Sequence, residues 1–377
     1  MSLEKQWSFE DSAIWKLKIK IQFSGWLQYV IHAIWILVLL LIAGIGRLIG
    51  QWQVLLYWLP LVLAALLSIA LVGTIIMVKY GLHPAEKVPP NNNDLDVFDL
   101  MRARKSCRSF QSRNLTTEHR DELLKVVQFH SQPNQLLGKK PIRFEYIKAA
   151  LSVWPVVGAH EFLVAIAPRE YDRLSIIDVG RSLQKVVIQA TRMGIATCWI
   201  GPGADNKSIL QHLDNKIDTT KDHVICVCAV GYDSMYKPLF VRLFDRLMHK
   251  RLPLSELFYA APSFNEPLDT RASPFRDYGR CYEVCQWSPS SYNGQTTRCA
   301  AISEEVNGEE KIIRFDFFTS IASRYYAAIA LGIWCANWET GCAALNKHGH
   351  FAILPSKERA SETAREFPRY DISWVVD

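Results

Sequence analysis

The chain has 377 residues, a formal net charge of +6 and nine cysteines. Its length allows one large domain or two ordinary ones beside an apolar N-terminus. Because its basic residues are spread out, with no basic stripe carrying interleaved aromatics, nucleic-acid binding is not expected. The cysteines form no C-x-x-C pair or regular framework, which favours a reducing compartment over a disulfide scaffold. Cys281 and Cys285 lie one helical turn apart but lack histidines at ligand spacing, so we expect no metal site.

Two apolar runs stand near the N-terminus. The first, residues 26–45, follows a polar leader with lysines at its end, and the second covers residues 54–78. As a helix the second run would reach about 37 Å, at ~1.5 Å per residue, which exceeds the ~30 Å hydrocarbon core of a bilayer. The alternatives are a buried core helix for either run or a signal peptide for the first. We favour a hairpin of two transmembrane helices.

The charges around this hairpin predict its orientation. The link between the runs holds a single positive charge, Arg47, whereas lysines flank the outer ends of both runs. By the positive-inside tendency, both chain ends and everything after the hairpin face the cytoplasm. We therefore expect a multi-pass membrane protein with its tail and anchor in residues 1–82 and a Pro- and Asn-rich linker in residues 83–95.

An arginine-rich segment, R-K-S-C-R-S-F, occupies residues 104–110. In an extended segment Arg104, Ser106 and Arg108 share one face, while the residues between them point away. Two guanidinium groups around a hydroxyl suit a phosphate, which carries about −1.5 to −2 charges. A solvated basic face is the alternative for such a cluster.

The middle of the chain predicts strands and helices. Residues 161–167 and 223–231 are apolar runs typical of buried strands, and residues 177–193 between them are helical in period. This helix ends at Gly194, and a short strand then leads to Gly201. The pattern indicates an α+β fold, a sheet packed by helices.

A polar turn, S-P-S-S-Y-N-G-Q-T-T-R-C, occupies residues 288–299. Pro289 fixes one φ angle, and Ser290, Ser291 and Asn293 offer short polar groups that can bond a ligand or the local backbone. It follows a helix predicted at residues 275–287. An ordinary helix-to-strand loop is the alternative.

Together these stretches resemble the nitroreductase family of FMN flavoproteins. Its members open with R-x-S-x-R-x-F, here residues 104–110, and carry A-P-S-x-x-N-x-Q-P-W-R-F, here residues 288–299 with substitutions. A helix running into a G-L-x-x-C-W-I-G turn is similar to residues 178–201. The resemblance covers roughly residues 96–377, with two threonines in place of the family's Pro-Trp at positions 296 and 297.

The order of these elements differs from the ordinary family, in which the proline-serine element follows the arginine element by one helix. The family is a dimer whose flavin lies between subunits, with one element from each. We therefore predict two degenerate copies in one chain, at residues 96–262 and 263–377, that form an intramolecular pseudo-dimer with one complete site at their junction. Residues 130–144 would be a scrambled proline-serine element, and residues 321–333 would be a helix of the second copy.

The resemblance also implies roles for individual residues. The backbone N–H of Gly201 would be the donor near flavin N5, although Pro202 departs from many relatives. Arg251 lies in a segment similar to the family's closing R-K-P-L-E-E-L and would reach the FMN phosphate. The expected cofactor-binding residues are Arg104, Ser106, Arg108, Gly201, Arg251, Pro289, Ser290, Ser291 and Asn293.

The function implied is a membrane-anchored, FMN-dependent oxidoreductase. NAD(P)H would reduce the flavin and leave, and a small electron-poor acceptor such as a nitroaromatic or a quinone would then take the electrons. No catalytic side chain is assigned, and further oligomerisation is left open. The main alternative is a non-catalytic, flavin-binding or flavin-free membrane sensor or interaction module, which the changes at residues 130–144 and 296–297 favour. A specialised reductive branch such as a membrane-bound deiodinase is a third possibility.

Overall fold

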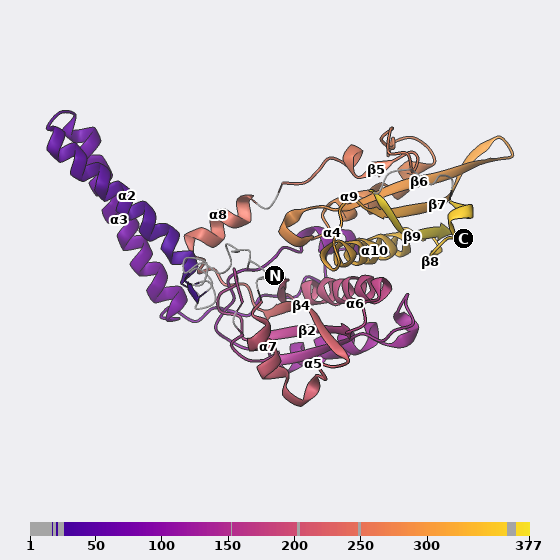
Figure 1. Cartoon of the computed structure of the whole chain (residues 1–377), viewed down its shortest axis with the longest axis horizontal. Helices are drawn as coiled ribbons and strands as arrows, with labels where there is room; N and C mark the ends of the chain where they lie inside the picture. Colours follow the sequence, from indigo (N-terminus) through magenta and orange to yellow (C-terminus); the bar gives the residue numbers. More distant parts are fainter. Residues whose placement is uncertain are drawn as a thin grey trace, which may run out of the picture.

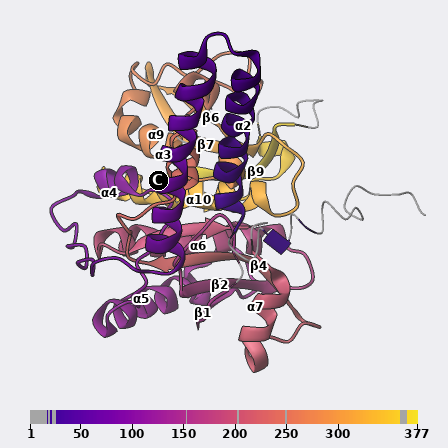
Figure 2. The same ribbon diagram turned by 90° about the vertical axis from the view of Figure 1, so that its left-hand side faces the viewer.

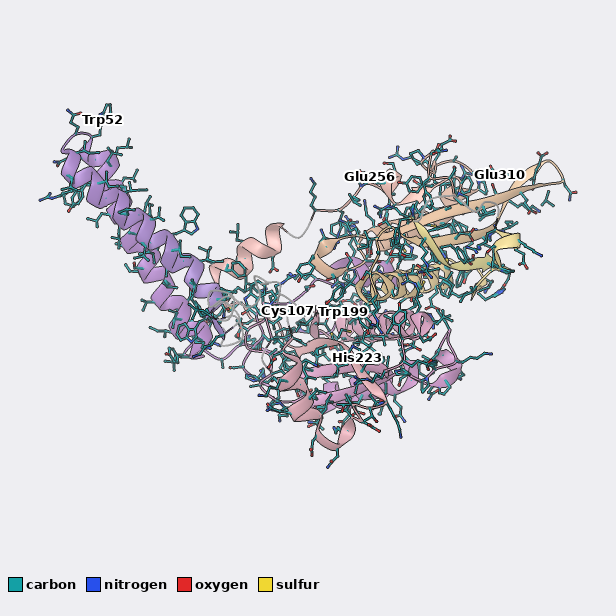
Figure 3. All side chains as sticks on the ribbon, viewed as in Figure 1. Trp52, Cys107, Trp199, His223, Glu256 and Glu310 are labelled. Atoms are coloured by element: carbon teal, nitrogen blue, oxygen red, sulfur yellow. The ribbon has the colours of Figure 1, made fainter. Side chains whose placement is uncertain are left out.

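A helical hairpin projects from the body of the protein (Figures 1 and 2). The computed structural model describes Leu17, Lys20, Ile21 and residues 26–151, 153–201, 204–247, 250–359 and 367–377. The outward helix is α2 (Leu27–Ile49), and the returning helix, Val54–Lys79, has α3 (Leu59–Thr74) as its regular part. Both helices are long and apolar enough to cross a membrane. Figure 3 places Trp52 at the tip, so both ends of the hairpin lie at the body.

The body contains two sheets. The first has the order β1-β2-β4-β3, with every neighbouring pair antiparallel. The second has the order β5-β6-β7-β9-β8, in which only β5 and β6 are parallel. The strands are β1 (Arg143–Lys148), β2 (Glu161–Pro168), β3 (Ala196–Ile200), β4 (Asp222–Gly231), β5 (Phe258–Tyr259), β6 (Thr297–Val306), β7 (Glu309–Thr319), β8 (Gly349–Ala352) and β9 (Arg369–Val376).

Two long helices lie between the sheets, α6 next to the first and α10 next to the second (Figure 1). Residues of these helices and of the inner sheet faces form one continuous hydrophobic core, which includes Phe315 and Trp338. The helices of the body are α4 (Val97–Ala103), α5 (Thr117–His130), α6 (Arg173–Arg192), α7 (Asn206–Leu213), α8 (Leu239–Leu247), α9 (Gly279–Gln286) and α10 (Tyr326–Ala344). The α+β class predicted from the sequence is confirmed.

The two halves of the body follow the same chain path. Each has a helix, two strands, a long helix and two further strands: α5-β1-β2-α6-β3-β4 and α9-β6-β7-α10-β8-β9, with α7 inserted before β4. In both sheets these four strands have the spatial order first, second, fourth, third. The short β5 precedes the second half in the chain, yet it pairs with β6 at the edge of the second sheet.

Helices α6 and α10 cross at two glycines. A Cβ atom on Gly332 would lie 2.0 Å from the carbonyl oxygen of Ile177, and one on Gly180 would lie 2.3 Å from the carbonyl oxygen of Ile329. No side chain fits at either position, so the two backbones approach each other directly. The crossing brings the halves together along their central helices.

Local signals explain where these helices begin and end. The Asp172 carboxylate accepts the Ser175 N–H at 2.9 Å, which caps α6, and α6 stops before Gly194, whose φ of 72° suits glycine. The helix predicted at residues 321–333 instead spans Tyr326–Ala344. Most of α10 is buried on every side, so no polar face marks its end in the sequence.

Candidate functional site

The arginine-rich segment runs in extended form along the first sheet. Ser106 forms a parallel bridge with Thr197 of β3, and the N–H of Cys107 donates to the Thr197 carbonyl at 2.8 Å. Figure 3 accordingly shows Cys107 and Trp199 close together. The Cys107 thiol is buried and donates to an Asp233 carboxylate oxygen at 3.1 Å. Strand-like alternation therefore sends Cys107 into the core and leaves its neighbours on the other face.

Arg104, Ser106 and Arg108 surround the Cys198 thiol. Burial raises the pKa of this thiol, while the charges of Arg108 and Arg104 and a hydrogen bond from Ser106 oppose the rise. The three side chains that the sequence places on one face are thus close together. Arg108 also donates to the Asp245 carboxylate of α8 at 2.5 Å, a partner that sequence reasoning missed.

Arg104 is a buried cation without an ion-pair partner among the residues that the structure describes. Its side chain is 8% exposed, and its Nε and Nη1 have no hydrogen-bond partner among the described residues. Burial, and then the nearby charges of Arg251 and Arg108, lower its pKa to about 10. An unsatisfied buried cation costs stability, and an anion with several acceptor oxygens would remove that cost.

Arg251 approaches from the segment after α8 and joins the first half to the polar turn of the second. Its Nη1 donates to the Asn293 side-chain oxygen, and its guanidinium lies 5.4 Å from the centre of the Trp287 ring. The Asn293 amide donates in turn to the Lys250 carbonyl at 2.7 Å. Burial lowers the pKa of Arg251, and its Nε has no hydrogen-bond partner among the residues described. Arg104, Arg108 and Arg251 therefore make one cationic cluster.

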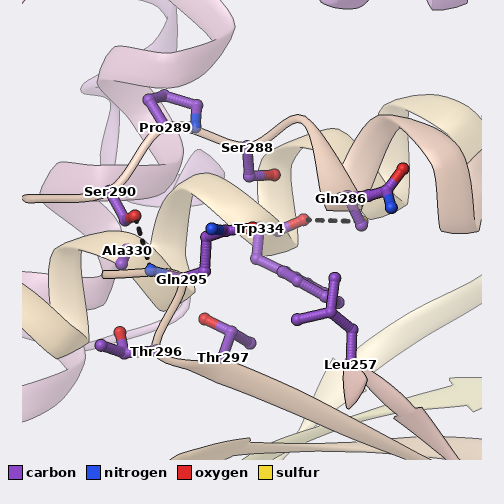
Figure 4. A pocket seen from close by; sticks show the side chains of 11 residues that line it. Leu257, Gln286, Ser288, Pro289, Ser290, Gln295, Thr296, Thr297, Ala330 and Trp334 are labelled. Carbon is purple, nitrogen blue, oxygen red and sulfur yellow. Dashed lines mark hydrogen bonds between the residues drawn. The ribbon is translucent and has the colours of Figure 1, made fainter. Parts of the chain in front are cut away.

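The polar turn adopts a backbone of left-handed residues. Tyr292, Asn293 and Gln295 have φ angles of 51°, 55° and 45°. The Ser290 hydroxyl accepts the Gln295 N–H at 2.9 Å (Figure 4), and Ser291 begins the short helical turn Ser291–Asn293. Asparagine tolerates the left-handed region, but tyrosine and glutamine adopt it rarely, and such strain concentrates at functional sites.

Pro289 and Ser290 line a small pocket against α10 (Figure 4). Ala330 and Trp334 of α10 form its other side. Its volume of about 10 Å³ holds about one water molecule. Of the predicted cofactor-binding residues, Pro289 and Ser290 therefore face a cavity that holds one water molecule and is too small for a flavin. The cationic cluster lies outside this cavity.

Gly201 lies against an aromatic ring of the second half. A Cβ atom on Gly201 would be 3.1 Å from Cε1 of Tyr326, the first residue of α10. Burial raises the pKa of Tyr326, and the nearby Tyr292 phenol adds to the rise. The two tyrosines thus bring the polar turn close to Gly201, a contact that sequence reasoning missed. Pro202 and Gly203, which follow in the sequence, lie outside the described residues.

Side chains of α6 hold the turn at residues 135–138, which lies in the stretch interpreted from the sequence as a scrambled proline-serine element. The Asp178 carboxylate accepts the N–H groups of Leu137 and Gly138, both at 2.8 Å. Arg181 donates to the Gln135 carbonyl at 2.6 Å and pairs with Glu339 of α10. Protein groups therefore occupy these two N–H groups and this carbonyl. This contrasts with the cationic cluster, where N–H groups of Arg104 and Arg251 have no such partners among the described residues.

His130 beside this turn gives the protein a predicted acid sensitivity. Burial, and then the charge of Lys185, lower the pKa of its imidazole from 6.5 to about 4. As the pH falls, the imidazole is protonated in the unfolded chain at a higher pH than in the folded protein. The free energy of unfolding therefore falls as pH drops from about 6.5 to about 4. Because the ring is partly exposed, we expect a loss of about 1–2 kcal/mol.

Denaturant unfolding of the parent and of His130→Gln across this pH window measures that contribution. The amide cannot take up a proton, so the variant should lose less stability than the parent on acidification. An identical pH dependence of both proteins would contradict the assignment to His130.

A family model and several solved structures match the chain. The family described as "Putative TM nitroreductase" matches residues 96–336. A protein from Thermotoga maritima, described as a "putative nitroreductase", is 14% identical, with 78% of this chain and 97% of that one covered at a TM-score of 0.44. No curated protein matches the chain.

Two further structures match about one half of the body. A nitroreductase with bound FMN from Bacteroides fragilis is 14% identical, covering 37% of this chain and 89% of that one, at a TM-score of 0.31. The FMN-dependent nitroreductase NfnB from Mycobacterium smegmatis, in complex with NADPH, is 13% identical, covering 36% and 86%, at a TM-score of 0.30. Because the family model spans more than half of the chain, this protein belongs to the nitroreductase family.

Proposed function

We propose that this protein is a membrane-anchored, FMN-dependent oxidoreductase that uses NAD(P)H to reduce a small electron-poor acceptor such as a nitroaromatic or a quinone. The observation that carries the proposal is Arg104, a buried guanidinium with N–H groups that have no partner among the described residues. Arg108 of the same segment and Arg251 of a distant one lie near it. A protein of the nitroreductase family has a use for such a cluster in binding the cofactor's phosphate.

The residues present fit FMN by the chemistry of their donors. Arg104, Arg108 and Arg251 offer guanidinium N–H groups to phosphate oxygens, and Ser106 adds a hydroxyl. The backbone N–H of Gly201 would serve the reactive edge of the flavin without adding a competing proton. When bound, the flavin supplies the hydride and electron transfer. The protein then contributes binding, orientation and a fixed electrostatic field.

The second wall of the site comes from the polar turn. Asn293 holds the Arg251 guanidinium through its side-chain oxygen and so sets the direction of the remaining N–H groups of Arg251. The strained backbone at Tyr292 and Gln295 positions the turn, to which Pro289, Ser290 and Ser291 belong. In this proposal the turn closes the site from the side opposite the arginine-rich segment.

We further propose that the two halves of the body, residues 96–262 and 263–377, are degenerate copies that form an intramolecular pseudo-dimer. The support is the shared order of four strands in each sheet and the crossing of the central helices at Gly180 and Gly332. A single site would then lie at the junction. In the first half, the corresponding turn is held by hydrogen bonds to Asp178 and Arg181 of α6, and in this proposal it does not form a second flavin site.

The hairpin would anchor this body to a membrane. Its two helices meet the body at the same end (Figure 1), so the whole body lies on one side of the bilayer. Basic residues at the outer ends place that side in the cytoplasm. In this proposal residues 1–82 form the tail and anchor, and residues 83–95 connect the anchor to the catalytic body.

Rapid mixing of the purified full-length protein with NADH or NADPH tests the enzymatic role. We expect the visible absorption of bound oxidised flavin to bleach with at least one nucleotide and to return on addition of a water-soluble quinone. A flavin that binds but stays oxidised with both nucleotides would replace the enzyme with a flavin-binding module. A protein that stays colourless after incubation with FMN and desalting would overturn both the enzymatic role and the flavin-binding role.

A further inference from the structure

Helix α8 presents apolar side chains to solvent. Leu239 and Leu243, one helical turn apart, are 47% and 53% exposed, and Met235 just before the helix is 72% exposed. Val241 is 1% exposed and faces the body. The exposed side also carries Arg242. A short amphipathic helix with leucines on its outer face and an adjoining cation is typical of helices that lie in a membrane interface.

The position of α8 matches this composition. The helix packs beside α2 where the hairpin leaves the body (Figure 1). The loop before α8 contacts the segment that follows the hairpin, because the Glu86 carboxylate accepts the Met235 N–H at 2.7 Å. The His83 ring also stacks on Tyr236 with 4.3 Å between ring centres. These contacts hold α8 at the level where the transmembrane part of the hairpin would begin.

The inner side of α8 borders the candidate site. Asp245 accepts the hydrogen bond from Arg108, and the Phe240 ring centre lies 5.8 Å from that of Trp154. The residue before Trp154 is paired with Ala204, whose N–H donates to the Gly201 carbonyl at 3.3 Å. One helix therefore has Arg108 and Trp154 on one side and an exposed apolar surface on the other.

We propose that α8 lies in the headgroup layer of the membrane that the hairpin spans. Met235, Leu239 and Leu243 enter the lipid, and Arg242 remains among the lipid headgroups. The bilayer is the occupant because α8 packs against α2, one of the two apolar helices that are long enough to cross a membrane. This inference rests on the proposed membrane anchoring. Together with the proposed function, it brings the arginine cluster next to the bilayer surface, where acceptors dissolved in lipid are accessible.

Depth-dependent quenching in the full-length chain tests this placement. The nine native cysteines are all buried, so a fluorescent thiol label can be directed to a single introduced cysteine. The test variant is Leu243→Cys, with Leu41→Cys on the exposed face of α2 and Glu309→Cys on the distant β7 as matched controls. Each is reconstituted into vesicles containing either lipids with a shallow nitroxide or lipids with a deep nitroxide. Aqueous iodide is the third quencher.

We expect the label at position 243 to be quenched several-fold more by the shallow nitroxide than the label at position 309, which iodide should reach. The label at position 41 should respond to the deep nitroxide. If it does not, the hairpin is not in the membrane and the anchoring proposal fails together with this inference. If position 41 responds but iodide reaches position 243, α8 lies in water and only this inference is overturned. A label at 243 that no quencher reaches also overturns it, because protein then covers the face.

Discussion

The Arg104→Met variant is expected to lose FMN and, at the same time, to be more stable than the flavin-free parent. Arg104 is 8% exposed and has side-chain N–H groups without partners among the residues described. Methionine fills a similar length of space without a buried charge, so the flavin-free fold should gain about 1–3 kcal/mol. Loss of two charge-assisted contacts to phosphate should weaken FMN binding by about a hundredfold or more.

Visible absorption after incubation with FMN and desalting measures the first effect, and thermal unfolding of the flavin-free proteins measures the second. Lys105→Met is the matched control, because Lys105 is the exposed neighbour of Arg104. This control should retain the flavin spectrum and the stability of the parent. An Arg104→Met protein that binds FMN normally would contradict the phosphate role, and one that is destabilised without flavin would show that Arg104 is a structural cation.

The Gly332→Ala variant is expected to disturb the packing of α10 on α6 and so to destabilise the protein. The new Cβ would lie 2.0 Å from the Ile177 carbonyl oxygen and 2.8 Å from the Arg181 nitrogen. Both neighbours are backbone atoms of α6, so only a shift of one whole helix relieves the overlap. We expect the free energy of unfolding to fall by about 3 kcal/mol or more, and flavin binding to weaken because the site uses residues from both halves.

Gly279→Ala is the control for the general effect of replacing a helical glycine. Gly279 opens α9, and a Cβ there would have no neighbour within 4 Å. Alanine should leave stability unchanged or raise it by up to about 1 kcal/mol. Denaturant unfolding of the two variants in detergent compares them directly. A Gly332→Ala protein as stable as Gly279→Ala would mean that α6 and α10 are not held in the close crossing described here.

Local periodicity predicted much of this protein. The alternation of an extended segment predicted that Arg104, Ser106 and Arg108 share a face, and all three influence the Cys198 thiol. Apolar runs of transmembrane length predicted the hairpin, and apolar strands with a helical stretch between them predicted β2, α6 and β4. In each case the signal lies within one segment and arises from the geometry of that segment alone.

Contacts between distant segments could not be read in this way. Asp245 meets Arg108 from 137 positions along the chain, and Tyr326 packs on Gly201 from the other half of the body. No periodicity links such residues, because their encounter depends on how α6 and α10 cross and how the segment around α8 returns. The end of α10 was misplaced for a related reason, since a helix buried on all sides has no polar face to mark its length.

The amino-acid sequence by itself therefore determined the α+β class, the apolar hairpin and the residue types suited to a phosphate, because these depend on composition and local spacing. Only the tertiary structure decided that Arg251 joins Arg104 and Arg108 in one cluster and that Arg104 is buried within it. The physical reason is that burial and the convergence of like charges are properties of packed segments. The same packing leaves Leu239 and Leu243 of α8 exposed beside the hairpin. It also places Asp178 of α6 where it accepts a hydrogen bond from Leu137.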